Sequence, residues 1–260
     1  MNRINGKTVL VTGASAGIGE ATARAFASFG ADLILCARRE DRLTQLKEDL
    51  ESQHGITIHT KSLDVRNRHA VQAFASELIA QDLVPDVLVN NAGKALGLHP
   101  LHEGLLEDWE EMMETNVMGL LYMTRAILPA MVERNSGHIV NIGSVAGHQV
   151  YQKGAVYNAS KFAVKALNEG MSLDLLGTGI RVSSIDPGAV ETEFSQVRFH
   201  GDQDRAKTVY DGFKPLTGED IADIITFVVN TPEHVNILDL IVLPTAQRSA
   251  HMIYKEPSPE

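Results

Sequence analysis

Short apolar runs alternate along the chain with longer segments of helical spacing, and this alternation limits the possible folds more than any other feature. The runs end in polar or turn-forming residues and occupy positions 8–13, 32–37, 56–65, 86–93, 137–144, 180–188 and 240–246. The clearest helical segments between them are Glu20–Phe29, Asp41–Gln53, His69–Gln81, Asp108–Arg134 and Val156–Leu176. Strands that alternate with helices predict βαβ units, which build a parallel sheet with right-handed crossovers.

No linker rich in proline, glycine or serine interrupts this pattern. We therefore predict one domain over residues 1–250 and a flexible tail over residues 251–260. In parallel α/β sheets, ligands bind beyond the carboxyl ends of the strands, where the polar residues that end the apolar runs gather. We expect the functional site at that edge.

Charge and cysteine content narrow the function classes. The formal net charge of −10 argues against a nucleic-acid or anionic membrane partner, although a local basic pocket for a small anion is compatible with it. One cysteine, Cys36, excludes an intrachain disulfide and predicts a reducing, cytoplasmic setting. The sequence has neither an apolar stretch long enough to span a membrane nor a signal-peptide pattern, and its histidines lack metal-ligand spacing. We expect a small-molecule partner, no membrane and no metal.

The first apolar run leads into a glycine-rich turn, "TGASAGIGE", that opens a helical segment. Gly13, Gly17 and Gly19 permit a tight turn and a close approach of the backbone to a pyrophosphate, for which the helix N-terminus supplies N–H donors. Glycines also end strands for purely structural reasons, but the position after the first strand of a βαβ unit favours nucleotide binding.

The second run ends in "ARRED", which bears on the choice of dinucleotide. NAD-binding folds place an acidic residue here for the ribose 2′-hydroxyl, whereas Arg38 and Arg39 suit a 2′-phosphate. Ser15 could add a hydroxyl donor from the glycine turn. The alternative is that the two arginines only begin the next helix or pair with neighbouring acids. We predict NADP(H) as the cofactor.

Tyr157 and Lys161 are four residues apart at the start of a helical segment, so both lie on one helix face. A lysine close to a phenol favours the ionised phenol, which makes tyrosine a better proton carrier at neutral pH. Taken alone, the pair could equally pack its stems together on the surface. Ser144 precedes Tyr157 by thirteen residues at the end of the fifth run, and Asn116 stands in "TNVMG".

These motifs, in order from Thr12 to Thr192, resemble those of the short-chain dehydrogenase/reductase family. The resemblance implies an α/β fold with a doubly wound Rossmann-type parallel seven-stranded sheet and helices on both faces. It implies that Tyr157 is the acid/base and that Lys161 lowers the phenol pKa and binds the nicotinamide ribose. Ser144 would bind the substrate oxygen, and Asn116 would hold a water that relays protons from Lys161.

The resemblance also implies which residues contact the cofactor. They are Gly13, Ser15, Gly17, Ile18, Gly19, Arg38, Arg39, Asp64, Val65, Asn91, Ala92, Gly93, Tyr157, Lys161, Pro187, Gly188, Val190 and Thr192. In place of the asparagine common before "PG" in the family, this chain has Ile185 and Asp186. The family's usual assembly, together with apolar residues on more than one face of 108–134 and 156–176, predicts a homotetramer, or at least a dimer.

Within the family, several longer segments resemble bacterial NADP-dependent 3-hydroxy acid dehydrogenases, among them "VLVNNAGKALGLHP" and "ETEFSQVRFHGD". This implies oxidation of serine, L-allo-threonine, 3-hydroxypropionate or related compounds. The alternatives are reduction of another small anionic aldehyde such as sulfoacetaldehyde, a general short-chain alcohol or carbonyl reductase, and a non-catalytic NADP-binding sensor.

The polar segment 195–216 has the composition of a mobile loop over the site, and it contains Arg198, Arg205 and Lys207. An anionic substrate in a shielded site needs a cationic or N–H partner. Arg198 is the first choice because Val197 and Phe199 beside it could anchor the loop inward. Ordinary surface charges are the alternative, and His148 is a further candidate for the anion.

Overall fold

The seven strands form one sheet in the order β3-β2-β1-β4-β5-β6-β7, and all neighbours are parallel. The structure is a computed structural model that describes residues 1–256, except for the side chains of residues 206 and 207. The strands are β1 (Thr8–Thr12), β2 (Asp32–Ala37), β3 (Ile58–Ser62), β4 (Val87–Asn90), β5 (Gly137–Ile142), β6 (Ile180–Pro187) and β7 (Asp239–Val242). The strand order reverses between β1 and β4, which confirms the predicted doubly wound fold.

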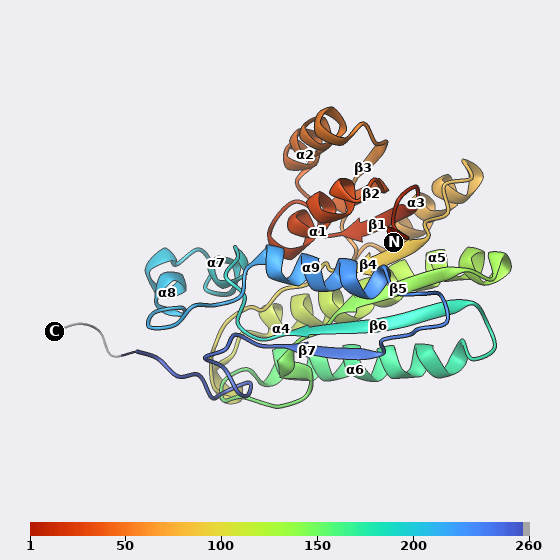
Figure 1. Cartoon of the computed structure of the whole chain (residues 1–260). Helices are drawn as coiled ribbons and strands as arrows, with labels where there is room; N and C mark the ends of the chain where they lie inside the picture. The colour runs from red at the N-terminus through yellow and green to blue at the C-terminus, as the bar shows by residue number, and fades with distance from the viewer. Residues whose placement is uncertain (257–260) are drawn as a thin grey trace.

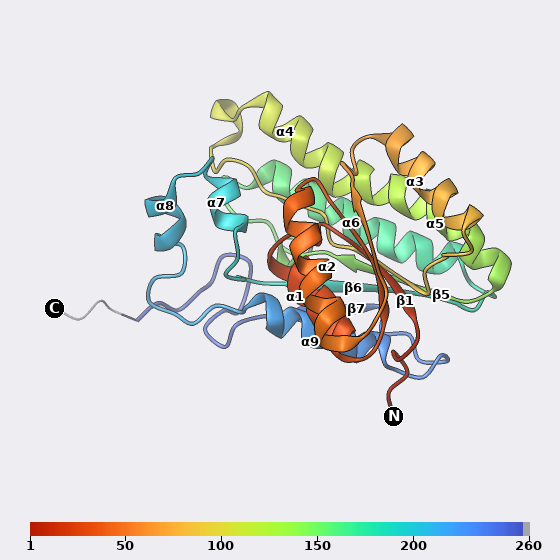
Figure 2. The ribbon, with the colours of Figure 1, turned by 90° about the horizontal axis from the view of Figure 1, so that it is seen from above.

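Helices cover both faces of the sheet (Figures 1 and 2). One face carries α1 (Gly17–Ser28), α2 (Glu40–His54) and α9 (Gly218–Val229). The other carries α3 (Arg68–Ala80), α4 (Leu106–Met113), α5 (Leu120–Arg134) and α6 (Ala155–Asp174). Alternate residues of each strand contribute to two hydrophobic cores, one on each face of the sheet. In β1, Val9 and Val11 pack with α1 and α9, while Leu10 packs toward α3 and α5. This double burial explains why the strands read as continuous apolar runs.

Local sequence signals set several helix ends. Asn67 caps α3 by accepting the N–H of Ala70, and Thr217 with Asp220 forms a capping box at the start of α9. Gly55 follows α2 with φ of 66°, the left-handed conformation that glycine adopts at least cost. No helix among the described residues is long and apolar enough to cross a membrane.

The predicted helix 108–134 is not a single α-helix. Between α4 and α5 lies a π-helical turn, η2 (Glu114–Gly119), which contains Asn116. Such turns are rare and are not visible in hydrophobic spacing, so the sequence predicted a regular helix through this point. Two short 3₁₀ helices, η1 (Leu101–Glu103) and η3 (Val145–Gly147), follow β4 and β5.

The segment 195–216, expected to be an irregular loop, contains two short helices, α7 (Phe194–Arg198) and α8 (Gln203–Thr208). Both lie at the end of the sheet where the carboxyl ends of the strands point (Figure 1). In the predicted tail, Tyr254 and Glu256 make backbone hydrogen bonds to Ala246 and Gly212, whereas residues 257–260 lie outside the described residues. We call residues 189–217, which connect β6 to α9, the lid segment.

Candidate functional site

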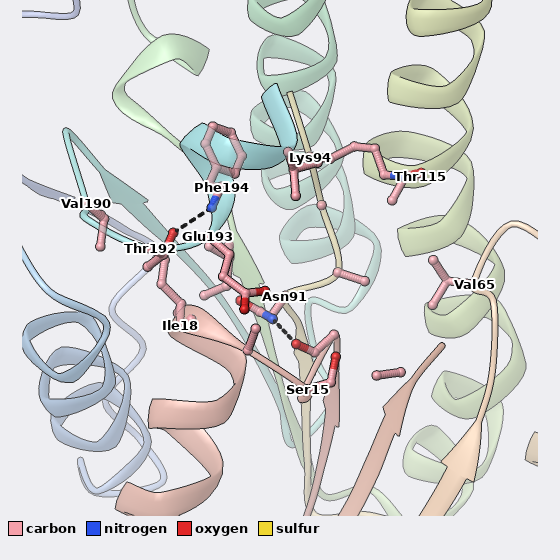
Figure 3. A pocket seen from close by; sticks show the side chains of 18 of the residues that line it. Ser15, Ile18, Val65, Asn91, Lys94, Thr115, Val190, Thr192, Glu193 and Phe194 are labelled. Atoms are coloured by element: carbon pink, nitrogen blue, oxygen red, sulfur yellow. Dashed lines mark hydrogen bonds between the residues drawn. The ribbon is translucent and has the colours of Figure 1, made fainter. Parts of the chain in front are cut away.

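A cavity of about 340 Å³ lies at the carboxyl ends of the strands. Every predicted cofactor residue except Gly19 lines it, and Ser144 lines it as well. Asn116, Arg198 and His148 are not among the lining residues. Figure 3 shows Thr192, Glu193 and Phe194 on one side of the cavity and Val65 and Thr115 on the other. Segments from most of the chain therefore meet in one hollow, as the sheet topology predicts.

The glycine turn leaves no room for side chains. A Cβ atom on Gly13, which has φ of 68°, would lie 2.9 Å from the Asn91 amide nitrogen. A Cβ atom on Gly19 would overlap the carbonyl oxygen of Gly13, so this glycine lets α1 pack against the turn. Asn91 fixes the turn by donating to the carbonyl of Thr12 at 2.8 Å. The result is a backbone cradle at a helix N-terminus, suited to a pyrophosphate.

The arginine end of the cavity is more crowded than the sequence predicted. Arg39 donates to the Ser15 hydroxyl at 3.1 Å and pairs with Glu193 of the lid segment at 2.8 Å. Glu193 also accepts from Arg42 at 2.7 Å. Arg38 is mostly exposed and lies 3.9 Å from Glu111. Arg39 and Ser15 thus meet as predicted, and a carboxylate from the lid segment joins them.

Asp64 and Val65, the residues predicted to flank adenine, both line the cavity. Arg66 grips the Asp64 carboxylate through both oxygens, at distances of 2.6–3.0 Å. The side-chain hydrogen bond from Arg66 lowers the pKa of Asp64. Asp64 is therefore ionised at neutral pH and held in place before any ligand binds.

Tyr157, Ser144 and Lys161 come together at the inner end of the cavity, from α6 and the end of β5. Lys161 Nζ donates to the carbonyl of Ile142 at 2.8 Å and lies 6.0 Å from the Tyr157 ring centroid. The Ser144 hydroxyl donates to the Pro187 carbonyl at 3.3 Å, a long bond, and accepts from the Ala146 N–H at 3.1 Å.

Burial governs the protonation of these groups. The pKa of Tyr157 is raised, first by desolvation and then by Tyr151, while the hydrogen bond with Ser144 and the charge of Arg198 lower it. Desolvation lowers the pKa of Lys161 to about 8. Desolvation outweighs the lowering of the phenol pKa that the resemblance implied for Lys161, whose ammonium donates to the Ile142 carbonyl. Tyr157 is protonated at neutral pH.

The π-helical turn directs the Asn116 side chain into the protein. Its Oδ1 accepts the Lys94 N–H and its Nδ2 donates to the Lys94 carbonyl, both at 2.8 Å, and Nδ2 also donates to Ser160 at 3.0 Å. A Cβ atom on Gly93 would lie 3.3 Å from Asn116 Oδ1 and 3.8 Å from Lys161 Nζ. Glycine at this position therefore lies close to both groups and avoids a tight contact with Asn116.

Arg198, at the end of α7, lies beside Tyr157. Its Cζ is 5.9 Å from the Tyr157 ring centroid and 5.4 Å from that of Tyr151, and its Nη2 donates to the Tyr151 hydroxyl at 2.9 Å. Within the described part of the chain, no carboxylate pairs with Arg198. The α7 backbone is anchored by a hydrogen bond from Gly97 to the Arg198 carbonyl at 2.9 Å.

His148 and Arg205, the other candidate cations with described side chains, make different contacts from those of Arg198. His148 Nε2 lies 2.9 Å from Asp186 Oδ2 and 3.7 Å from Asp239 Oδ2. Arg205 stacks over Phe199, with its Cζ 4.4 Å from the ring centroid. The Lys207 side chain lies outside the described residues. His148 is bound to carboxylates, so we do not assign it to a substrate anion.

Several residues of the site were missed in the sequence. Glu193 and Phe194 enter from the lid segment, and Tyr151 contacts Arg198 from the loop before α6. The Thr12 hydroxyl accepts the N–H groups of Asn91 and Ala92, both at 3.0 Å. Only Thr12 had a local signal, because it ends the first apolar run beside the glycine turn.

Known proteins resemble this chain in both sequence and fold. A sequence profile described as short chain dehydrogenase matches residues 7–203. An NADP-dependent 3-hydroxy acid dehydrogenase of Salmonella typhi is 49% identical over 243 residues, or 93% of this chain and 96% of that protein. Sulfoacetaldehyde reductase 2 of Chromohalobacter salexigens is 45% identical over 92% of this chain and 94% of that protein. The closed form of serine dehydrogenase complexed with NADP+ has a TM-score of 0.90 and 46% identity, covering 96% of this chain and 100% of that one.

Proposed function

This chain belongs to the short-chain dehydrogenase family, and from that premise we propose that it interconverts a small 3-hydroxy acid or β-hydroxy amino acid with its carbonyl compound, using NADP(H). The predicted enzyme class, an NADP-dependent oxidoreductase, is confirmed. Serine, L-allo-threonine and 3-hydroxypropionate are the substrates that we favour. The observation that carries the proposal is Arg198, which has no carboxylate partner among the described residues and lies beside Tyr157, one of the residues that line the cavity.

The residues of the cavity fit NADP(H). The turn around Gly13 and Gly17 lines the cavity at the N-terminus of α1, which suits a pyrophosphate bound by backbone N–H groups. Arg38, Arg39 and Ser15 would hold the 2′-phosphate, with hydroxyl and guanidinium groups already in contact. Asp64 and Val65 would flank the adenine, Tyr157 and Lys161 would bind the ribose, and Pro187, Gly188, Val190 and Thr192 would hold the nicotinamide end. Bound NADPH supplies a hydride to the carbonyl carbon.

The proton chemistry falls to the chain's own residues. In reduction, Tyr157 donates its phenolic proton to the substrate oxygen, while the Ser144 hydroxyl donates a hydrogen bond to the same oxygen. The raised pKa of Tyr157 keeps the phenol protonated before the step. Lys161 and Asn116 both lie close to Gly93, and a water held between them would return a proton to the tyrosine. Oxidation reverses these transfers.

An anionic substrate would be selected by Arg198. Its guanidinium is held in place by the Tyr151 hydroxyl and by the Gly97 carbonyl, the latter at 3.3 Å. A carboxylate two bonds from the reacting carbon would find this cation on the side of Tyr157 where Phe194 packs against the tyrosine ring. The same cation accepts a sulfonate, so a sulfoacetaldehyde reductase is the second candidate, favoured by the similarity to a protein of that name.

The test measures NADP+ reduction with L-serine, 3-hydroxypropionate, isethionate and 1-propanol. Arg198→Ala should lower kcat/KM for the preferred anion by more than about tenfold and change 1-propanol little, because a charge partner is lost. Arg205→Ala is the matched control, since this arginine is in the same segment but stacks on Phe199. An equal loss on all substrates would make Arg198 structural. If no hydroxy compound is oxidised although NADP+ binds, the chain is a non-catalytic sensor and the proposal is wrong.

The assembly and location of the enzyme are part of the same proposal. Phe162 and Leu173 on α6 and Val132 on α5 leave large apolar side chains exposed, which suits a homotetramer through these helices. Light scattering on the purified protein tests this, and a monomer would contradict it. A single buried cysteine suits the reducing conditions of the cytoplasm.

A further inference from the structure

A carboxylate is buried next to Ser144, and the proton transfers above do not use it. Asp186 is the penultimate residue of β6, at the position where asparagine is common in the family, and only 2% of its surface is exposed. A buried carboxylate is costly unless hydrogen bonds and charges compensate it, so its contacts indicate what it does.

Asp186 holds both ends of the turn that carries Ser144. Its Oδ1 accepts the N–H of Ser144 at 3.0 Å, and its Oδ2 lies 2.9 Å from Nε2 of His148, which directly follows η3. Ser184 donates a further hydrogen bond to Oδ1 at 2.8 Å. A Cβ atom on Gly143 would overlap Oδ1, so glycine at this position makes room for the carboxylate.

Ser144 is held by few contacts of its own. Its hydroxyl donates a long bond to the Pro187 carbonyl, accepts from the Ala146 N–H within the same turn, and faces the Tyr157 hydroxyl. The Gly143 N–H, one residue earlier, donates to the Ile185 carbonyl of β6 at 2.8 Å, and the hydrogen bond from the Ser144 N–H to Asp186 is a further link to β6, made by a side chain. Any drift of this turn would move the serine hydroxyl relative to Tyr157.

The charge of Asp186 also reaches the reacting groups. Burial and then the neighbouring Asp239 of β7 raise the pKa of Asp186, while His148 from the turn lowers it. On α6, desolvation is the largest cause of the pKa shifts of Tyr157 and Lys161, and the charge of Asp186 adds a smaller contribution that raises both pKa values. Tyr157 also faces Tyr151 and Arg198, whose contributions are opposite in sign.

We infer that Asp186, paired with His148, is a positioning residue that fixes the Ser144 turn and whose negative charge acts on proton transfer by Tyr157. The inference rests on the proposed function, because it assigns Ser144 and Tyr157 to the reaction. Asp186 does not line the cavity, so its effect on cofactor binding is small.

The test compares Asp186→Asn and Asp186→Ala with the parent, using whichever hydroxy compound the parent oxidises best. Asparagine keeps an acceptor for the Ser144 N–H, so kcat at the optimum should stay within about threefold, whereas alanine removes it and should lower kcat at least about tenfold. Both variants lose the negative charge. Without this charge, Tyr157 and Lys161, which titrate as a coupled pair, should release their first proton at a lower pH. The pH at which kcat/KM for oxidation rises should therefore be lower than in the parent, by roughly half a pH unit or more.

Ser184→Ala is the matched control, since it removes a donor to the same oxygen and keeps both the charge and the Ser144 contact. Its profile should follow that of the parent. His148→Gln keeps a donor for Oδ2, so it should retain more activity than His148→Ala. Identical kcat and an unmoved profile in Asp186→Ala, or equal loss in both Asp186 variants with no shift, would overturn the inference.

Hydrogen exchange gives a readout that needs no turnover. The peptide containing Ser144 should exchange faster in Asp186→Ala and remain protected in Asp186→Asn, because only alanine removes the acceptor. Unchanged protection in Asp186→Ala would refute the anchoring role even if the substrate proposal failed. Should the alanine variant not fold, the asparagine profile alone decides, since an unmoved profile there contradicts the role of the charge.

Discussion

Replacing Arg39 with alanine should convert a strong NADP preference into a weak one. In the structure the Arg39 guanidinium bonds Ser15 and pairs with Glu193 at the rim of the cavity, and 41% of its side chain is exposed. Hydrogen bonds to charged groups contribute roughly 1.5–3 kcal/mol, and solvent screening at this exposure favours the lower end. At about 1.4 kcal/mol per decade, NADP+ affinity should fall by about tenfold. NAD+ has no 2′-phosphate, so its affinity should change by less than about twofold.

The assay is the Kd of each nucleotide, together with the ratio of kcat/KM for NADP+ and NAD+. Arg24→Ala is the matched control, because Arg24 is also an ion-paired arginine, with 43% of its side chain exposed, but does not line the cavity. Arg38→Ala should act in the same direction as Arg39→Ala, since both line the hollow. An unchanged nucleotide ratio in both variants, or equal use of the two nucleotides by the parent, would refute the assignment of the phosphate site.

Three further changes test the site. Glu193→Gln removes the carboxylate that occupies two arginines, so NADP+ should bind about two- to fivefold more tightly by calorimetry, and weaker binding would count against this. Tyr157→Phe should leave the Kd of NADP+ within about threefold and lower kcat at least about 10²-fold, and near-normal turnover would exclude this acid/base. Because burial lowers the pKa of Lys161 to about 8, the unfolded chain binds that proton more tightly, and the stability of the cofactor-free protein should rise between pH 8 and 10. Lys161→Met should remove that rise of stability with pH and should unfold at a higher temperature than the parent at pH 7. Thermal unfolding curves at two pH values check both expectations.

The sequence predicted the sheet and most of the cavity because both follow from local features. Runs buried on two faces identify strands, parallel strands bring their carboxyl ends together, and the residues that end the runs must then line one hollow. Gly13, Ser15 and Arg39 were found for this reason. The Tyr157 and Lys161 pair was found because a helix places residues four apart on one face.

The features of the site that the sequence could not predict depend on contacts between segments that are far apart in the chain. Glu193 meets Arg39 across 154 positions, and Arg198 meets Tyr151 across 47. Tyr151 lies in the loop before α6, where helical spacing gives no signal. The direction of the Tyr157 pKa shift was also missed, because desolvation depends on how completely the surrounding elements bury the ring.

The π-helical turn at Glu114–Gly119 changes how the apolar residues of 108–134 should be interpreted. Such a turn holds one residue more than an α-helical turn, so it rotates everything after it by about 100° around the helix axis. Apolar residues before and after the turn are therefore out of phase when they are counted on one uninterrupted wheel. Met112 before the turn packs in the cluster with Ala146 and Tyr157, whereas Ile127 after it packs with Leu10 and Phe74, so the two-faced pattern partly reflects two buried surfaces of one chain. Met112 of α4 and Ile127 of α5 are both buried within a single chain, so only residues that remain exposed, such as Val132, are left to meet another subunit.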